Sequence, residues 1–166
     1  MNTKGRQGFT LIEILIVVAI IAILASVVLV GLGPTQRAGR DARRISDLRN
    51  VQNGLELFYN RCGYYPGTLN CGAATPQLGA AINSNASWLF MTAALQGTTS
   101  IGVSQVPDDP NTANHYQYGS GGTGNNTYML GAQLEDLNNS ALAQSPNVTT
   151  LGVPCSKALG VYCVQL

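Results

Sequence analysis

One acidic residue, Glu13, stands at the start of a long apolar run and is the first candidate for chemistry in this chain. From Ile14 to Gly33 the sequence has twenty residues without a charge, and Ser26 carries the only hydroxyl group. An ionised carboxylate in lipid costs roughly 2.5–3.5 kcal/mol on insertion scales, so such a residue is a functional candidate by default. The alternative is that Glu13 lies near enough to the end of the run to reach the lipid headgroups.

The other side chains that could do chemistry are few. His115 is the only histidine, and it follows Asp108 and Asp109 in the sequence. Calcium is an option that these two aspartates leave open, although the sequence has no spaced acidic loop. No G-x-S-x-G, Walker, H-E-x-x-H or Cys/His metal pattern occurs. We therefore expect no enzyme activity and no resident cofactor, and we expect solvated turn acids at Asp108, Asp109, Glu135 and Asp136.

Four cysteines fall into two close pairs, Cys62 with Cys71 and Cys155 with Cys163. Neither pair has the C-x-x-C spacing of a zinc or redox site. Disulfides need an oxidising compartment, so bonded cysteines would place the part after the apolar run outside the cytoplasm. Four cysteines allow three connectivities, and we favour bonding within each close pair.

Composition indicates an anchored, polar domain. The chain has 166 residues, a formal net charge of +1 and 10% charged residues. Its overall charge is therefore too small to attract the chain to nucleic acid. The apolar run matches the ~20 residues that a helix needs to cross a bilayer. A cleaved signal usually has a shorter apolar stretch, so we expect a retained membrane helix. Basic residues on both sides leave its orientation open by charge alone.

The residues that follow the run predict a second helical part. We expect a helix break at Gly31, Gly33 and Pro34, as a kink or a locally melted segment, because glycine has low helix propensity and proline lacks a backbone N–H group. Apolar residues then recur at three- and four-residue steps, which predicts an amphipathic helix on a globular domain. These residues are Ala38, Ala42, Ile45, Leu48, Val51, Leu55 and Phe58. The nearby arginines are expected on its solvated face, with some contact to headgroups or neighbouring subunits.

Further along, two stretches alternate between apolar and polar residues and predict half-buried strands. The first contains Tyr116 and Tyr118, and the second runs from Tyr128 to Leu134. The glycine-rich stretch 119–126 connects them, which predicts an antiparallel hairpin. Residues 87–95, SWLFMTAAL, predict a short helix that covers the sheet.

The segment KGRQGFTLIE, followed by an apolar helix, closely resembles the N-terminus of bacterial type IV pilins and type II secretion pseudopilins. The resemblance implies cleavage after Gly8 by a prepilin peptidase and N-methylation of Phe9. It also implies an ion pair during assembly between the amine of Phe9 in one subunit and the carboxylate of Glu13 in a neighbour. LELFYNRCGYYPG and VPDDPNTANHYQYGSGGTGNNTYMLGAQLED resemble pseudopilin segments, whereas the pair Cys155 and Cys163 resembles the disulfide loop of type IV pilins.

The resemblance implies an α+β fold, in which a long N-terminal helix packs on a small antiparallel sheet (the pilin fold). Four parts are expected: a leader peptide, a membrane or filament-core helix, an amphipathic helix that continues into the head, and an extracytoplasmic head with the hairpin. Their expected ranges are 1–8, 9–33, 34–61 and 62–166.

The function that the resemblance implies is that of a structural subunit of a type IV pilus or pseudopilus-like filament, polymerised through its N-terminal helix. The precursor would cross the inner membrane once and then enter an extracellular or periplasmic filament. Its expected partners are copies of itself or related pilins, the prepilin peptidase and an inner-membrane assembly platform. The alternative is a membrane-anchored extracytoplasmic binding module that does not polymerise.

Overall fold

The computed structural model describes residues 8–67, 71, 85–97 and 102–166. Apart from Gly8, the expected leader lies outside the described residues. The chain divides into two compact units, Met1–Arg37 and Ala38–Leu166. We describe each unit by itself, and call the second unit the head.

The longest element is helix α1, Leu11–Cys62, which contributes to both units. It ends where Gly63 adopts a left-handed backbone conformation with φ 79°. The N–H group of Gly63 donates to the carbonyl oxygen of Tyr59 at 2.7 Å, which satisfies one of the open carbonyls of the last turn. A glycine directly after the last helical residue therefore terminates α1.

Of the break expected at Gly31, Gly33 and Pro34, the locally melted segment is wrong, and the kink stays a prediction. Helix α1 continues through all three residues, with Pro34 inside it. A proline removes a single backbone donor and costs about 3 kcal/mol, and a glycine costs about 1 kcal/mol. Propagation of a formed helix adds one hydrogen bond for each residue fixed, so the long flanking segments carry the helix across these local penalties.

The head contains a three-stranded antiparallel sheet in the order β1-β2-β5. Tyr118 of β1 is opposite Leu130 of β2, and Leu130 is opposite Val164 of β5. A second, two-stranded sheet joins β3 and β4. The elements are α2 (Asn85–Gln96), β1 (Gln117–Gly121), β2 (Thr127–Gln133), α3 (Ala141–Gln144), β3 (Thr149–Thr150), β4 (Val153–Pro154) and β5 (Val161–Gln165).

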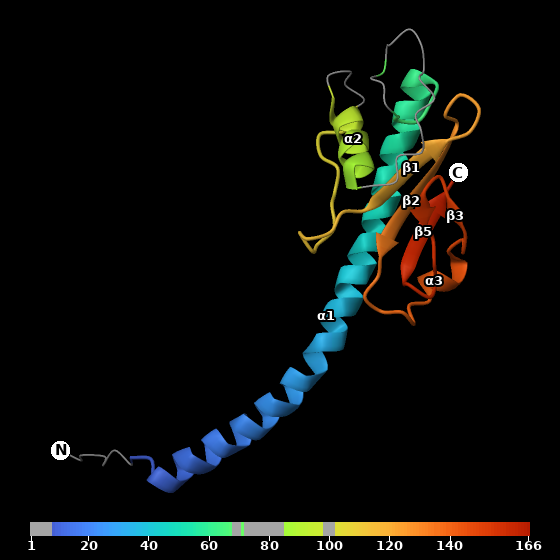
Figure 1. Ribbon diagram of the computed structural model, residues 1–166. Coiled ribbons are helices and arrows are strands. Elements are labelled where there is room, and N and C mark those ends of the chain that lie inside the picture. The colour runs from blue at the N-terminus through green and yellow to red at the C-terminus, as the bar shows by residue number, and fades with distance from the viewer. Residues whose placement is uncertain (1–7, 68–70, 72–84, 98–101) are drawn as a thin grey trace, which may run out of the picture. The chain divides into compact units, whose positions relative to one another are not determined.

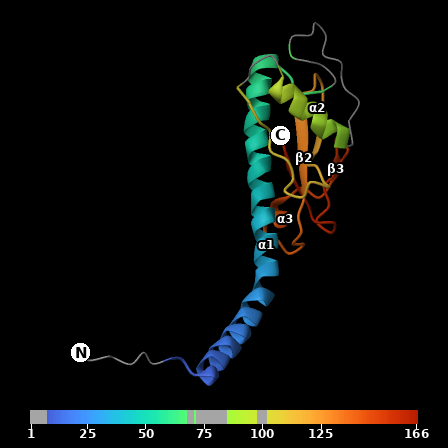
Figure 2. The same ribbon diagram turned by 90° about the vertical axis from the view of Figure 1, so that its left-hand side faces the viewer.

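Figures 1 and 2 show the head portion of α1 running alongside the sheet, with α2 close to β1. Side chains from all three elements form one apolar core. Its largest fully buried apolar members are Trp88, Tyr65, Tyr116, Tyr128, Phe58, Leu48, Leu55, Met91, Leu95 and Leu130. The α+β class, the short helix and the hairpin are thereby confirmed, whereas β3, β4 and β5 were not predicted.

The apolar stripe predicted on α1 is confirmed only in part. Leu48, Val51, Leu55 and Phe58 are buried, but Ala38 and Ala42 are exposed. Continuing the buried face towards the N-terminus in three- and four-residue steps leads from position 48 to positions 44 and 41. The buried face of α1 therefore changes from apolar residues to the charged pair Asp41 and Arg44.

Candidate functional site

The predicted cleavage position lies in an accessible part of the chain. Gly8 and Phe9 precede α1, and the side chain of Phe9 is 83% exposed. A Cβ atom added at Gly8 would meet no other atom within 4 Å. The fold of this unit therefore places no demand on Gly8, and a requirement for glycine here would have to come from another protein.

Glu13 closes a capping box with Thr10 at the start of α1. Its Oε2 atom accepts hydrogen bonds from the backbone N–H of Thr10 at 3.0 Å and from the Thr10 hydroxyl at 2.9 Å. The N–H group of Glu13 in turn donates to Oγ1 of Thr10 at 3.4 Å. Such a box satisfies donors that the first turn of a helix leaves open. The T-x-x-E spacing of Thr10 and Glu13 is typical of a capping box and would have predicted it from the sequence.

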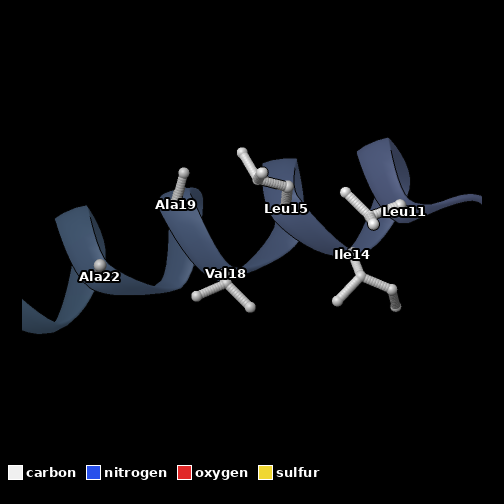
Figure 3. Close-up of a pocket in the computed structure, with 6 residues that line it drawn as sticks. All are labelled: Leu11, Ile14, Leu15, Val18, Ala19 and Ala22. Atoms are coloured by element: carbon white, nitrogen blue, oxygen red, sulfur yellow. The ribbon is translucent and has the colours of Figure 1, made fainter.

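The helix that follows exposes its apolar side chains. Every large apolar side chain from Leu11 to Leu29 is more than half exposed. Figure 3 shows part of this surface, where Leu15 and Ala19 project to one side of the helix and Ile14 and Val18 to the other. The helix is long and apolar enough to cross a membrane, with a mean hydropathy of 3.3 over its best window. An apolar surface on all sides needs lipid or other protein around it.

The four cysteines form two disulfides, Cys62–Cys71 and Cys155–Cys163. The Cα atoms are 5.4 Å apart in the first pair and 5.8 Å apart in the second. Bonding within each close pair is therefore confirmed. The second disulfide lies in a small buried cluster with Met129 of β2, Val153 of β4 and Val161 of β5.

The expectation of solvated turn acids is wrong for Asp109, and the expectation of a solvated arginine face is wrong for Arg44. Their side chains are 1% and 2% exposed and are paired with each other. Asp108 is 41% exposed and lies 2.5 Å from Nδ1 of His115. Within the described ranges, no group of three or more His, Cys, Asp or Glu side chains could hold a metal ion. The calcium option at Asp108 and Asp109 therefore has no support in the geometry.

Burial and charge perturb the side chains around Arg44. Hydrogen bonds from Arg40, together with those from Arg44, lower the pKa of Glu135 to about 2 against a smaller opposing effect of burial. Burial opposes the charged form of Arg44, but its carboxylate partners outweigh that and raise its pKa. Burial and a hydrogen bond to Asp47 raise the pKa of Tyr116. Glu135 and Arg44 are therefore ionised, and Tyr116 is neutral, near neutral pH.

Comparisons with known proteins point to the N-terminal segment. Residues 3–29 match the family model of the prokaryotic N-terminal methylation motif. The type II secretion system core protein G of Escherichia coli K12 is 33% identical over 66 residues, which are 40% of this chain and 46% of that protein. Its counterpart from Aeromonas hydrophila is 31% identical over 68 residues, or 41% and 48%. No solved structure matches the chain significantly.

The matched part of the chain spans about half the length of these curated relatives. Within that part, the resemblance to pilins and type II secretion pseudopilins is confirmed, because the methylation motif and the two relatives agree with it. The sequence analysis missed the buried cluster around Arg44. Its only signal was that positions 41 and 44 continue the spacing of the apolar stripe.

Proposed function

We propose that this chain is a structural subunit of a type IV pilus or pseudopilus-like filament, and that it is not an enzyme. One observation carries the proposal. The prokaryotic methylation motif covers residues 3–29, and within it the large apolar side chains of α1 from Leu11 to Leu29 are all more than half exposed. A simple membrane anchor would account for the apolar helix but would leave the motif, and the glycine that the fold does not need, unexplained.

In this proposal, residues 1–8 are a leader peptide that a prepilin peptidase removes from a single-pass precursor in the inner membrane. Phe9 becomes the N-terminus and is methylated. The helix of residues 9–33 then leaves the bilayer with the help of an assembly platform and enters an extracellular or periplasmic filament. Lipid and filament core are both apolar, so the hydrophobic effect changes little in this transfer, and packing and polar contacts decide it.

Glu13 has two successive partners in this scheme. In the single chain its carboxylate caps the helix through Thr10. After cleavage, the amine of Phe9 in a neighbouring subunit becomes available as a cation in the same apolar layer. Opposite charges attract strongly where the dielectric constant is low, and an unpaired charge there is costly. The pair would therefore favour one axial register between subunits.

The choice between pilus and pseudopilus depends on two different parts of the chain. The relatives carry the name of a secretion-system protein, but their similarity covers 66 to 68 residues. The disulfide loop Cys155–Cys163 resembles that of type IV pilins. Both alternatives are filaments made of copies of this chain or of related pilins. Our proposal is this common feature.

Mass spectrometry of the protein from a host with a prepilin peptidase tests processing. We expect an N-terminal N-methyl-Phe9. An intact Met1, or a cut near Ser26, would instead favour an anchored binding module that does not polymerise.

Three variants at the capping box separate the two roles of Glu13. Glu13→Gln keeps a capping side chain and removes the charge, Thr10→Ala removes the cap and keeps the charge, and Glu13→Ala removes both. We expect filament yield, measured by electron microscopy of sheared material, to fall with both Glu13 variants and to persist with Thr10→Ala. Normal filaments from Glu13→Gln would contradict the ion pair.

A further inference from the structure

The fully buried residues in the first turns of α1 that belong to the head are all charged, while Ile45 there is only half-buried against the apolar core. Between positions 38 and 47, the buried residues are Asp41, Arg44 and Asp47. Fully buried apolar residues begin only at Leu48. Buried ionic groups are costly unless they are paired and hydrogen-bonded, so their concentration at one end of a helix–sheet contact needs a reason.

The Arg44 guanidinium lies at the centre of this cluster. Its Nε and Nη2 atoms form a fork on the carboxylate of Asp109, at 2.9 and 3.0 Å. Its Nη1 atom donates to Asp41 at 2.8 Å and to Glu135 at 2.9 Å. One planar cation therefore joins α1 to the loop before β1 and to the turn after β2.

Asp41 also binds the turn after β2, by accepting hydrogen bonds from the backbone of that turn. Its two carboxylate oxygens accept the N–H groups of Glu135 and Asp136, each at 2.9 Å. Arg40 forms a second ion pair with Glu135 at 2.5 Å. Nearby, the hydroxyl of Tyr116 donates to Asp47 at 2.8 Å. These groups have fixed directions, so they tolerate neither rotation of α1 nor a shift along its axis.

The opposite end of α1 is attached differently. The Cys62–Cys71 disulfide and the continuing chain tie it covalently to the head. Tyr65, just beyond, exchanges hydrogen bonds with Asn125 in the turn between β1 and β2, at 2.9 and 2.6 Å. The N-terminal end of the contact has no covalent tie. Apolar contacts are not directional, so the stripe from Leu48 to Phe58 alone would allow this end to swing or slide.

We propose that Arg44 is a positioning residue, which together with Asp41 and Asp109 locks the sheet of the head onto the head portion of α1 in one rotation and one axial position. The lock supplies conformational specificity more than stability. Buried ion pairs add little net stability compared with neutral groups of similar shape, whereas a planar guanidinium fork admits a narrow set of geometries. The presentation of the head in a filament would follow from this lock and rests on the proposed function, but the lock itself does not.

The full chain in detergent micelles, where no filament is needed, provides the test. Spin labels are attached to cysteines introduced at two exposed positions, Ala42 on α1 and Thr123 between β1 and β2. Pulsed electron paramagnetic resonance measures the distribution of distances between them, and calorimetry measures the Tm of the head. We expect a single narrow distribution for the otherwise unchanged chain.

Two variants separate positioning from stability. Arg44→Met leaves buried carboxylates unpaired, so we expect Tm to fall by about 10 °C and the distribution to broaden. The triple variant Asp41→Asn, Arg44→Met, Asp109→Asn removes the charges of these three residues and keeps one acceptor oxygen at each of positions 41 and 109 for backbone N–H groups. Its Tm should recover to within about 5 °C of the parent, while the distance distribution stays about twice as broad.

Arg43→Met is the matched control, since Arg43 is the exposed neighbour of Arg44 and its ion pair with Asp47 spans 3.6 Å. It should change neither the distance distribution nor the Tm.

Arg44→Lys keeps the charge without the fork and should broaden the distance distribution at nearly unchanged Tm. A narrow distribution in the triple variant would overturn the proposal, whatever its filaments look like. Missing filaments combined with an intact lock would count against the proposed function alone.

Discussion

Two stretches of one helix depart in opposite ways from the rule that apolar side chains are buried and charged ones exposed. In the first unit, the apolar residues from Leu11 to Leu29 are exposed, and in the head the charged residues Asp41 and Arg44 are buried. Helical geometry is the same in both stretches. The difference shows that burial depends on what lies beside a helix. Arg44 has three carboxylate partners, whereas the described residues of the first unit, 8–37, form no second helix or strand.

This comparison also separates two sources of free energy. Burial of apolar surface is worth about 25 cal/mol per Å², and the first stretch can obtain it only from lipid or from other copies of the chain. The head obtains it within one chain, through the core that joins α1, α2 and the sheet. Changes in the first stretch should therefore affect processing and assembly, and changes in the second should affect folding of the head.

The largest effect is expected from Gly8→Ala. The structure tolerates the added Cβ atom, so folding should be unchanged. In the peptidase site, a displacement of the scissile bond by about 1 Å costs on the order of 100-fold in rate. Immunoblotting should show accumulation of the longer precursor. Cleavage at the normal rate would contradict the assignment of Gly8.

A matched pair of leucines tests the comparison directly. Leu55 is fully buried in the head, so Leu55→Ala should destabilise it by about 2–5 kcal/mol. Leu15 is 60% exposed, so Leu15→Ala should leave the unfolding of the head unchanged and reduce filament yield. Denaturant titration in detergent measures the first effect, and sheared filament yield measures the second. Equal destabilisation of the head by both variants would remove the distinction between the two stretches.

The smallest effect concerns the pH dependence of head stability. The pKa of Glu135 is lowered from 4.5 to about 2, chiefly by hydrogen bonds from Arg40. A carboxylate with a lower pKa in the folded state stabilises that state at pH above its unfolded pKa, and the contribution disappears as pH falls from 4.5 to about 2. Partial exposure and salt weaken this pair.

Thermal unfolding of the parent and of Glu135→Gln, from neutral pH down to pH about 2, measures the contribution. The two Tm values should differ modestly near neutral pH and converge in acid. A difference that grows in acid would show that Glu135 is not held ionised by its arginine partners.

Some of the fold was predictable because its causes are local. The stripe from Leu48 to Phe58, the short helix α2 and the hairpin β1–β2 each follow from spacing within a few residues. The locally melted segment predicted around Pro34 was wrong because the cost of a few residues was weighed without the helix on both sides. β5 was missed because its pairing with β2 joins residues about thirty positions apart.

The order of residues alone determined the membrane-length apolar run, the methylation motif and the capping pair Thr10 and Glu13. Each is a property of neighbouring residues and needs no distant partner. Only the tertiary structure decided that Arg44 and Asp109 are buried together. These residues are 65 positions apart, and a charge can leave water only where the folded chain brings every hydrogen-bonding partner to it at once.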